Sequence, residues 1–337
     1  MKTQKKAIAF GLLLFSLAGF SQTAKDSISK QDSLTRKAKA YFARQFAVAR
    51  PLNLEFIHMT PYQFAPKEGG TSVPKNTVDG YSQIKASVNF DFIKKRTWLL
   101  GSTFGYKYTN GSSEIISPSS HLELPNTTQF HYLYGSLNLT FFSRLFGKTV
   151  IYTSNITVDG SDQHFERATG LITGTLILKA TERTRFMVGA IVSIDPTSEI
   201  PVIPSVIFEH RFGNGWMADI LLPKQVMLRK HIFKKGRLSA GTELDRTSFY
   251  LYNINPENTS QKYEYRQLEL NNGLVYEHLI TDHVILTART GMKWIAISRI
   301  FEKNGNFNDP IYETKTDPAF YFNIGISFNP FIKKKVK

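Results

Sequence analysis

The stretch FYFNIGISF, residues 320–328, constrains the fold more than any other part of the chain. Phe or Ile occupies every second position, and Tyr, Asn, Gly or Ser lies between them. Because successive side chains of a β-strand point to opposite faces, this pattern predicts a strand with one apolar and one polar face. Residues 82–93, 130–143 and 282–298 repeat the alternation, so we expect an all-β body.

Segments of about ten residues match the length of a tilted strand that crosses a membrane. We expect strands near residues 52–63, 82–93, 97–108, 130–143, 148–158, 167–180, 184–194, 203–212, 215–222, 225–232, 236–252, 265–279, 282–298 and 318–331.

The predicted connections alternate between short and long. The short ones have the sequences KKR, RLFGK, TER, GNG, KKG and ITD. The long ones are residues 64–81, 109–129, 159–166, 195–202, 253–264 and 299–317. Outer-membrane barrels place short turns on the periplasmic side and long loops outside. The sequence therefore predicts a closed antiparallel transmembrane β-barrel in the cell outer membrane.

Residues 215–232 decide the strand number. As a single strand they would move every later long loop to the periplasm, so we place a reversal near Pro223. Two short strands here bring the total to fourteen, with both ends of the barrel on the periplasmic side. If the segment folds irregularly instead, twelve strands remain, and this is the alternative.

The closing strand is expected to present its Phe and Ile side chains to lipid and its Asn, Gly and Ser side chains to the lumen. Pairing with the first strand would then close the barrel. Closure matters because lipid offers no hydrogen bonds to the amides and carbonyls of a free strand edge.

The N-terminal residues predict export. Several lysines precede the short apolar run AIAFGLLLFSLAGF, and small residues follow it, which is typical of a secretory signal peptide, here residues 1–21. Residues 22–50 break the β pattern and form either a short basic periplasmic helix or a frayed leader. The barrel is expected to cover residues 51–331, and residues 332–337 are a basic tail.

The net charge of +15 is concentrated at the two ends. Residues 1–50 hold ten Lys or Arg and two Asp, and the tail IKKKVK adds four Lys, so the body is nearly balanced. This balance predicts no nucleic-acid partner. The chain has no cysteine, which removes disulfides, thiolate catalysis and Cys-bound metals.

Charged residues on the inward parity are expected to line the lumen. They are Lys85, Asp91, Lys107, Glu209, Arg211, Arg237, Glu243, Glu269, Glu277, Arg289 and Lys293. Both signs are present, so these residues either shape a path for solutes or pair and fill the interior. Trp98 and Trp216 follow short turns on the outward parity, which predicts anchors in the periplasmic membrane interface.

The histidines favour a protein that is not an enzyme. An outer-membrane hydrolase needs a His beside a Ser or an acid. His58 faces outward, and we expect Val88 near its neighbouring position on the second strand. His164 lies between Asp162 and Glu166 in an external loop, where such residues are usually solvated. We therefore expect no catalytic residue, no metal site and no cofactor.

The closing strand YFNIGISFNPF, the sequence GFSQ after the apolar run and the all-β body resemble the uncharacterised outer-membrane β-barrel proteins of Bacteroidota, grouped as a domain of unknown function. The last strand also resembles the C-terminal signal that the outer-membrane assembly machinery recognises, although six residues follow Phe331. The resemblance implies location, fold, and contact with outer-membrane lipid and that machinery. It implies no activity.

Passive passage of an unidentified small solute is the leading expectation for function. The first alternative is a filled barrel that is structural or binds surface partners through its loops. The second alternative is an outer-membrane hydrolase.

Overall fold

The computed structural model describes residues 50–68, 71–72, 74–114, 127–195, 197–198, 200–305 and 308–329. The predicted signal peptide, the basic tail and all of the segment 22–50 except Arg50 lie outside these residues. No helix in the described part is long and apolar enough to cross a membrane.

The regular elements of the described residues are strands. They are β1 (Leu52–Met59), β2 (Tyr62–Glu68), β3 (Thr71–Ser72), β4 (Asn76–Lys94), β5 (Trp98–Glu114), β6 (Thr127–Leu145), β7 (Lys148–Gly160), β8 (Phe165–Ala180), β9 (Thr184–Ile194), β10 (Val202–Arg211), β11 (Trp216–Leu222), β12 (Gln225–Ile232), β13 (Gly236–Leu251), β14 (Tyr263–Leu279), β15 (Val284–Glu302), β16 (Tyr312–Thr316) and β17 (Ala319–Phe328).

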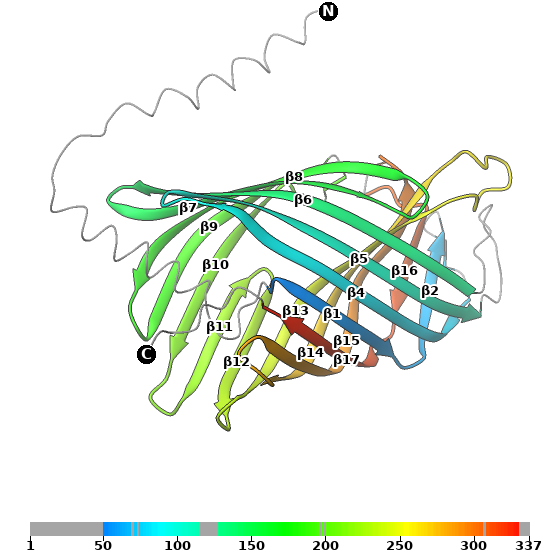
Figure 1. Cartoon of the computed structure of the whole chain (residues 1–337). Coiled ribbons are helices and arrows are strands. Elements are labelled where there is room, and N and C mark those ends of the chain that lie inside the picture. Colours follow the sequence, from blue (N-terminus) through cyan, green and yellow to red (C-terminus); the bar gives the residue numbers. More distant parts are fainter. Residues whose placement is uncertain are drawn as a thin grey trace, which may run out of the picture. The chain divides into compact units, whose positions relative to one another are not determined.

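Fourteen strands close into one antiparallel barrel (Figure 1). The order around the wall is β1, then β4 to β15 in sequence, then β17, which pairs with β1 again. The closing ladder runs from the pair Leu52–Phe328 to the pair Met59–Tyr321. The predicted strand number and the pairing of the first strand with the last are confirmed. β2, β3 and β16 prolong the wall at the end that carries the long connections, where β2 pairs with β4 and β16. We call this end extracellular, because outer-membrane barrels place their long loops outside.

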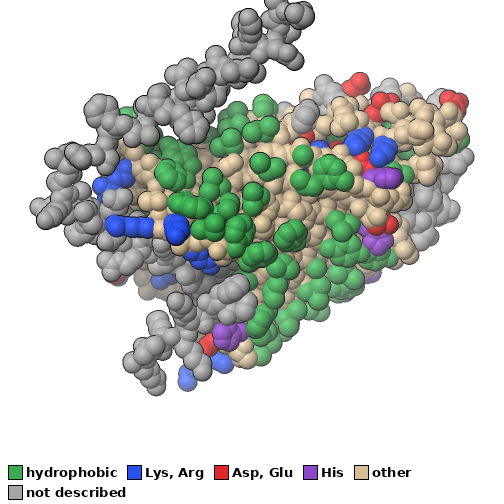
Figure 2. All heavy atoms as spheres, turned by 45° about the horizontal axis from the view of Figure 1, so that its top comes forward, with side chains coloured by type: hydrophobic (Ala, Val, Ile, Leu, Met, Phe, Trp, Pro, Cys, Tyr) green, Lys and Arg blue, Asp and Glu red, His purple; other side chains and the backbone are tan. Residues whose placement is uncertain are grey.

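Exposed and buried side chains alternate along β17 without exception. Ile324 and Ile326 expose 54% and 46% of their surface, whereas Asn323 and Ser327 expose 3% each. Figure 2 shows the apolar outer face as a broad band of hydrophobic side chains. Water-soluble proteins rarely expose a continuous apolar surface of this kind, whereas transmembrane β-barrels carry an outward-facing apolar band.

Several predicted loops contain strand residues. Residues 64–81 contain most of β2, all of β3 and the start of β4, while β5 and β6 extend into residues 109–129. The predicted strand boundaries were wrong because the ends of these strands are rich in Thr, Asn, Gly and Ser and show no alternation of apolar and polar residues. Ladder hydrogen bonds to neighbouring strands still hold them together beyond the apolar band.

The barrel wall is uneven in height. Pro223 and Lys224 form the short turn between β11 and β12, as predicted, and the ladder between β12 and β13 ends at the pair Gln225–Glu243. β13 nevertheless continues to Leu251. Its upper half stays paired with β14, extends beyond the end of β12 and approaches β6, where the rings of Phe249 and Phe130 stack at 3.8 Å between centroids.

Candidate functional site

Inward side chains on β1, β4, β13, β14 and β15, together with Arg50 just before β1, form a wall of charged residues, which we call the charged wall. Its members are Arg50, Glu55, Lys85, Arg237, Glu243, Asp245, Glu269, Glu277, Arg289 and Lys293. Arg237 Nε lies 2.5 Å from Glu277 Oε2, and Arg50 pairs with the same carboxylate. Lys293 pairs with Glu269, and both side chains expose 2% or less, so this pair is almost fully desolvated.

Two lysines reach across the lumen to β13. Lys85 Nζ on β4 lies 2.5 Å from Asp245 Oδ2, and Lys107 Nζ on β5 donates to the carbonyl oxygen of Arg246 at 3.0 Å. β4 and β5 are not neighbours of β13 in the wall, so these contacts cross the interior. The alternation of side chains along the strands placed both lysines on the inner face. It could not predict which strand their side chains contact.

The remaining predicted lumen residues differ in position. Glu209 is buried and lies 3.6 Å from Arg185 on the neighbouring strand. Asp91 and Arg211 are exposed near the periplasmic ends of β4 and β10. These two side chains therefore belong to the mouth of the barrel and not to its interior.

The opposite side of the barrel carries uncharged side chains, which we call the hydroxyl wall. Its members are Thr103, Ser136, Thr153, Thr157 and Thr173 on β5 to β8. They bond to polar neighbours on adjacent strands: Ser136 Oγ lies 2.6 Å from Thr157 Oγ1, and Thr153 Oγ1 lies 2.5 Å from Thr173 Oγ1. Each remains half-buried although it faces inward, which indicates open space beside this wall.

A second group of charges crosses the extracellular half of the lumen. Arg167 on β8 lies 3.1 Å from Asp159 on β7 and 3.1 Å from Glu264 on β14. Arg266 on β14 donates to Thr197 Oγ1, in the β9–β10 connection, at 2.7 Å. We call Asp159, Arg167, Asp195, Thr197, Glu264 and Arg266 the Arg167 cluster. Its charged side chains expose 9% or less.

The Arg167 cluster joins β14 to strands that are not its neighbours in the wall. Figure 1 shows the yellow segment after β13 beside the green end of β8, and there Lys262 Nζ lies 2.8 Å from Glu166 Oε1. In the β9–β10 connection, burial raises the pKa of Asp195, but hydrogen bonds from Thr197 and the charge of Arg167 lower it below its usual value. Asp195 is therefore ionised at neutral pH and lies 3.8 Å from Arg167.

Sequence reasoning missed the Arg167 cluster. Asp159 and Glu264 fall in predicted loops, so side-chain alternation could not assign either of them to the inner or the outer face. Arg167 lies at the first position of a predicted strand. Asp245 and Glu55 were also missed. Parity could have found these two, because both lie on the inward positions of predicted strands.

A small cavity lies in the extracellular half of the lumen, beside the bent end of β13. Its volume is about 170 Å³. We call it the aromatic chamber because Tyr62, Tyr81, Phe130, Phe249, Tyr265 and Tyr312 are among the residues that line it. These residues come from β2, β4, β6, β13, β14 and β16, so only the closed barrel brings them together.

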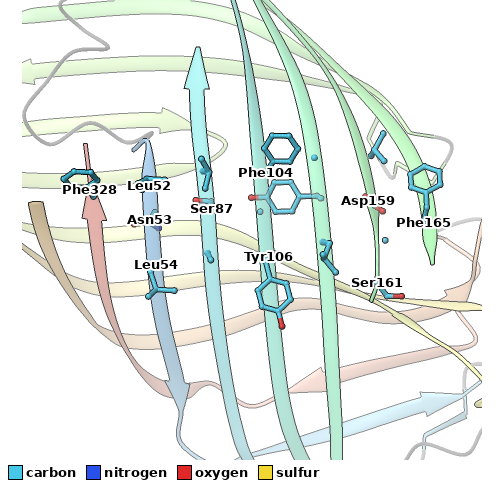
Figure 3. Close-up of a pocket in the computed structure, with 18 of the residues that line it drawn as sticks. Leu52, Asn53, Leu54, Ser87, Phe104, Tyr106, Asp159, Ser161, Phe165 and Phe328 are labelled. Carbon is cyan, nitrogen blue, oxygen red and sulfur yellow. The ribbon is translucent and has the colours of Figure 1, made fainter. Parts of the chain in front are cut away.

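A larger hollow of about 820 Å³ lies on the outer face of the barrel. Figure 3 shows Leu54, Phe104 and Tyr106 around it, on β1 and β5. Beneath the hollow the barrel wall is tightly packed, since a Cβ added to Gly105 would lie 2.1 Å from the ring of Tyr134. Because most of the lining is apolar and faces outward, we interpret this hollow as lipid-filled surface and not as a solute site.

His58 has a closer partner than the sequence suggested. The register pairs it with Ser82 and not with a residue near Val88, so the expected neighbour was wrong. His58 Nδ1 lies 3.0 Å from Ser82 Oγ. Alternation predicts the face of a residue, but the stagger between strands is set by closure of the whole barrel.

Among the described residues, the loop histidine has no acid partner. His164 packs against the ring of Tyr252 at 5.9 Å, while Glu166 binds Lys262 and Lys303. Within the described residues, no three His, Asp or Glu side chains are grouped as a metal site would require.

The two predicted anchors lie where a membrane interface is expected. Trp98 and Trp216 begin β5 and β11 directly after short turns, and their ladder partners are Phe141 and Lys230. Lys230 Nζ lies 5.1 Å from the ring centre of Trp216. Anchoring itself stays a prediction.

A closed antiparallel barrel with an apolar outer face and a polar interior defines an outer-membrane β-barrel protein. Within that class, residues 51–329 match the model of the DUF6268 family, a domain of unknown function, and the chain belongs to this family. No curated protein matches it.

Several solved barrels are distantly similar to the chain. The COG4313 outer membrane channel from Pseudomonas putida F1 is 10% identical, over 85% of this chain and 98% of that chain, with a TM-score of 0.37. A Pseudomonas aeruginosa FadL homologue is 8% identical over 85% and 91%, with a TM-score of 0.38. Outer membrane phospholipase A from Escherichia coli is 12% identical over 81% and 92%, with a TM-score of 0.31. At these scores no residue role transfers to this chain.

Proposed function

We propose that this protein lets small solutes pass through the outer membrane without catalysis, and that the Arg167 cluster is the closed position of its gate. The observation that carries the proposal is the hydroxyl wall. Its half-buried Thr and Ser side chains bond to one another, and their partial exposure indicates space beside them. A wetted surface of uncharged hydroxyls suits passage, because it binds no ion tightly and does not exclude water.

The gate is proposed because polar contacts join β14 to β8 at the Arg167 cluster. Arg167 binds both Asp159 and Glu264, so its loss removes this link and leaves Asp159 buried without that cation, while Glu264 keeps its ion pair with Arg266. Breaking a buried ion pair from one side costs about 3–5 kcal/mol, and each 1.4 kcal/mol shifts an equilibrium about tenfold. The contact between β14 and β8 is therefore expected to open when Arg167 is removed.

The test is single-channel conductance in planar lipid bilayers. We expect rare openings in the native protein and an open probability at least about tenfold higher in Arg167→Gln. Arg183→Gln, in an exposed periplasmic turn, is the matched control and should behave as native. If neither the native protein nor Arg167→Gln conducts, the alternative of a filled structural or surface-binding barrel replaces this proposal.

We also propose what the sequence predicts about the origin and the assembly of the protein. These predictions are a cleaved signal peptide, a source in Bacteroidota, contact with outer-membrane lipid and insertion by the assembly machinery through the closing strand. Residue-specific crosslinking from Ile326 during insertion would show whether the assembly machinery contacts this strand.

The hydrogen bond between His58 and Ser82 favours a second candidate, a hydrolase that acts at the membrane surface. A His that accepts the proton of a Ser hydroxyl can activate it as a nucleophile. Hydrolysis of a chromogenic fatty-acyl ester by the native protein, abolished in Ser82→Ala, would support this candidate. Equal rates in the two proteins would exclude it.

A further inference from the structure

The wall of the aromatic chamber contains three nearly parallel rings. Phe130 and Phe249 stack at 3.8 Å with 9° between their planes, and Phe249 and Tyr265 stack at 4.5 Å with 14°. The rings come from β6, β13 and β14, and they meet because the end of β13 bends across the lumen. Such a stack offers a flat π-surface that matches another aromatic ring better than it matches a saturated one.

The size of the aromatic chamber limits what it can hold. An apolar cavity of about 150 Å³ in another protein binds benzene, and this chamber measures about 170 Å³. It therefore suits one six-membered ring with a short substituent and is too small for two fused rings.

The polar groups of the chamber differ in how they are satisfied. Ser298 Oγ donates to Tyr265 Oη at 3.0 Å, and Tyr265 in turn donates to Gln267. By contrast, Thr316 Oγ1 lines the chamber, is buried and has no hydrogen-bond partner among the described residues. A buried hydroxyl without a partner is costly, and a ligand group that bonds to it would remove that cost.

The charges near the chamber are already compensated. Arg299, which lines it, lies 3.1 Å from Glu313, and the buried pair of Lys293 and Glu269 is part of the same inner face. A charged ligand would enter without a free counter-charge, so the chamber favours a neutral molecule.

We infer that the aromatic chamber binds a neutral, single-ring aromatic molecule with one hydrogen-bonding substituent, and that this substituent bonds to Thr316 Oγ1. The inference rests on the proposed function, because it names the class of solute that enters the barrel. Binding does not require passage, so the two can be tested separately.

The test is calorimetric titration of the full barrel in detergent micelles, with empty micelles as the blank. Benzyl alcohol is the probe, cyclohexylmethanol lacks the aromatic face, toluene lacks the hydroxyl, and 2-naphthylmethanol is too large. We expect benzyl alcohol to bind about 2- to 10-fold more tightly than cyclohexylmethanol. 2-Naphthylmethanol should not bind measurably.

Two variants locate the site. Thr316→Val keeps the shape and removes the hydroxyl, so it should weaken benzyl alcohol binding about 2- to 10-fold and leave toluene binding unchanged. Thr314→Phe should fill the chamber and abolish binding of both. Ala288→Phe adds the same ring on the lipid face and is the control, and heat-modifiable mobility on gels verifies that each variant is folded.

Equal binding of benzyl alcohol and cyclohexylmethanol, or binding that survives Thr314→Phe in a folded variant, would overturn the inference. Conductance without benzyl alcohol binding would leave the proposed function in place and refute the ligand. Benzyl alcohol binding without conductance, in both the native protein and Arg167→Gln, would refute the proposed passage of solutes and leave the inference about the ligand in place.

Discussion

The charged wall and the hydroxyl wall face each other across one lumen, yet they fill it differently. In the charged wall, buried carboxylates such as Glu269 and Glu277 have cations on neighbouring strands. In the hydroxyl wall, short side chains satisfy one another and leave space beside them. The difference teaches that one barrel can place its buried ion pairs on one side and short uncharged side chains, with space beside them, on the other.

The largest expected effect comes from breaking a pair in the charged wall. Lys293→Met leaves Glu269 buried without its cation and should lower the free energy of unfolding by about 3–5 kcal/mol. Adding Glu269→Gln removes the charge and keeps an acceptor for Thr247 Oγ1, so the double variant should recover most of the loss. Thr153→Val in the hydroxyl wall should cost less than about 1.5 kcal/mol.

The measurement is guanidinium unfolding in lipid vesicles, followed by heat-modifiable mobility on gels. If Lys293→Met and Thr153→Val lose the same stability, the two walls do not differ as described.

The second effect compares the two faces of β7. Ile156 is 60% exposed on the outer face, so Ile156→Arg places a guanidinium in lipid at a cost of about 2–4 kcal/mol near the midplane. Thr153→Arg on the inner face has space beside the hydroxyl wall and should insert nearly as well as the native protein. Vesicle insertion assays that show equal yields would contradict the assignment of faces.

The third effect concerns the passage. In the Arg167→Gln background, Thr157→Trp should narrow the space beside the hydroxyl wall and reduce the single-channel conductance several-fold. Ile156→Trp, one position away on the lipid face, should leave the conductance unchanged. A reduction by both variants would mean that the path does not follow the hydroxyl wall.

The smallest effect concerns the membrane interface. In single-tryptophan variants that keep Trp98 or Trp216, lipids brominated near the headgroup should quench fluorescence more than lipids brominated at the chain ends. Stronger quenching by the chain-end bromines would place both indoles deeper than the periplasmic interface and change the position of the whole barrel in the membrane.

Alternation predicted the architecture well because it reports a local property. Each residue of the closing strand faces lipid or lumen according to its own position, and the alternating burial of β17 follows the sequence FYFNIGISF position by position. The reversal between β11 and β12 near Pro223 was predicted differently, from the side on which the later long loops must lie. The upper ends of β4, β5 and β6 escaped prediction because both of their faces are polar there and carry no period-two signal.

The candidate sites were predictable only in part. Lys85, Glu269 and Lys293 could be placed on the inner face, but the sequence could not show that Lys85 meets Asp245 across the lumen. The bend in β13, which creates both the aromatic chamber and the approach of β14 to β8, arises because β12 stops at Gln225 while β13 continues. No residue near the bend predicts this difference in strand length.

By itself the sequence determined an exported all-β chain whose strands have one face for lipid and one for the lumen, because side-chain alternation is a property of each strand alone. The tertiary structure decided the register of His58 against Ser82, the partners of the buried charges, the Arg167 cluster and the aromatic chamber. These depend on the stagger and the unequal heights of strands that are distant in sequence, and closure of the barrel sets both at once.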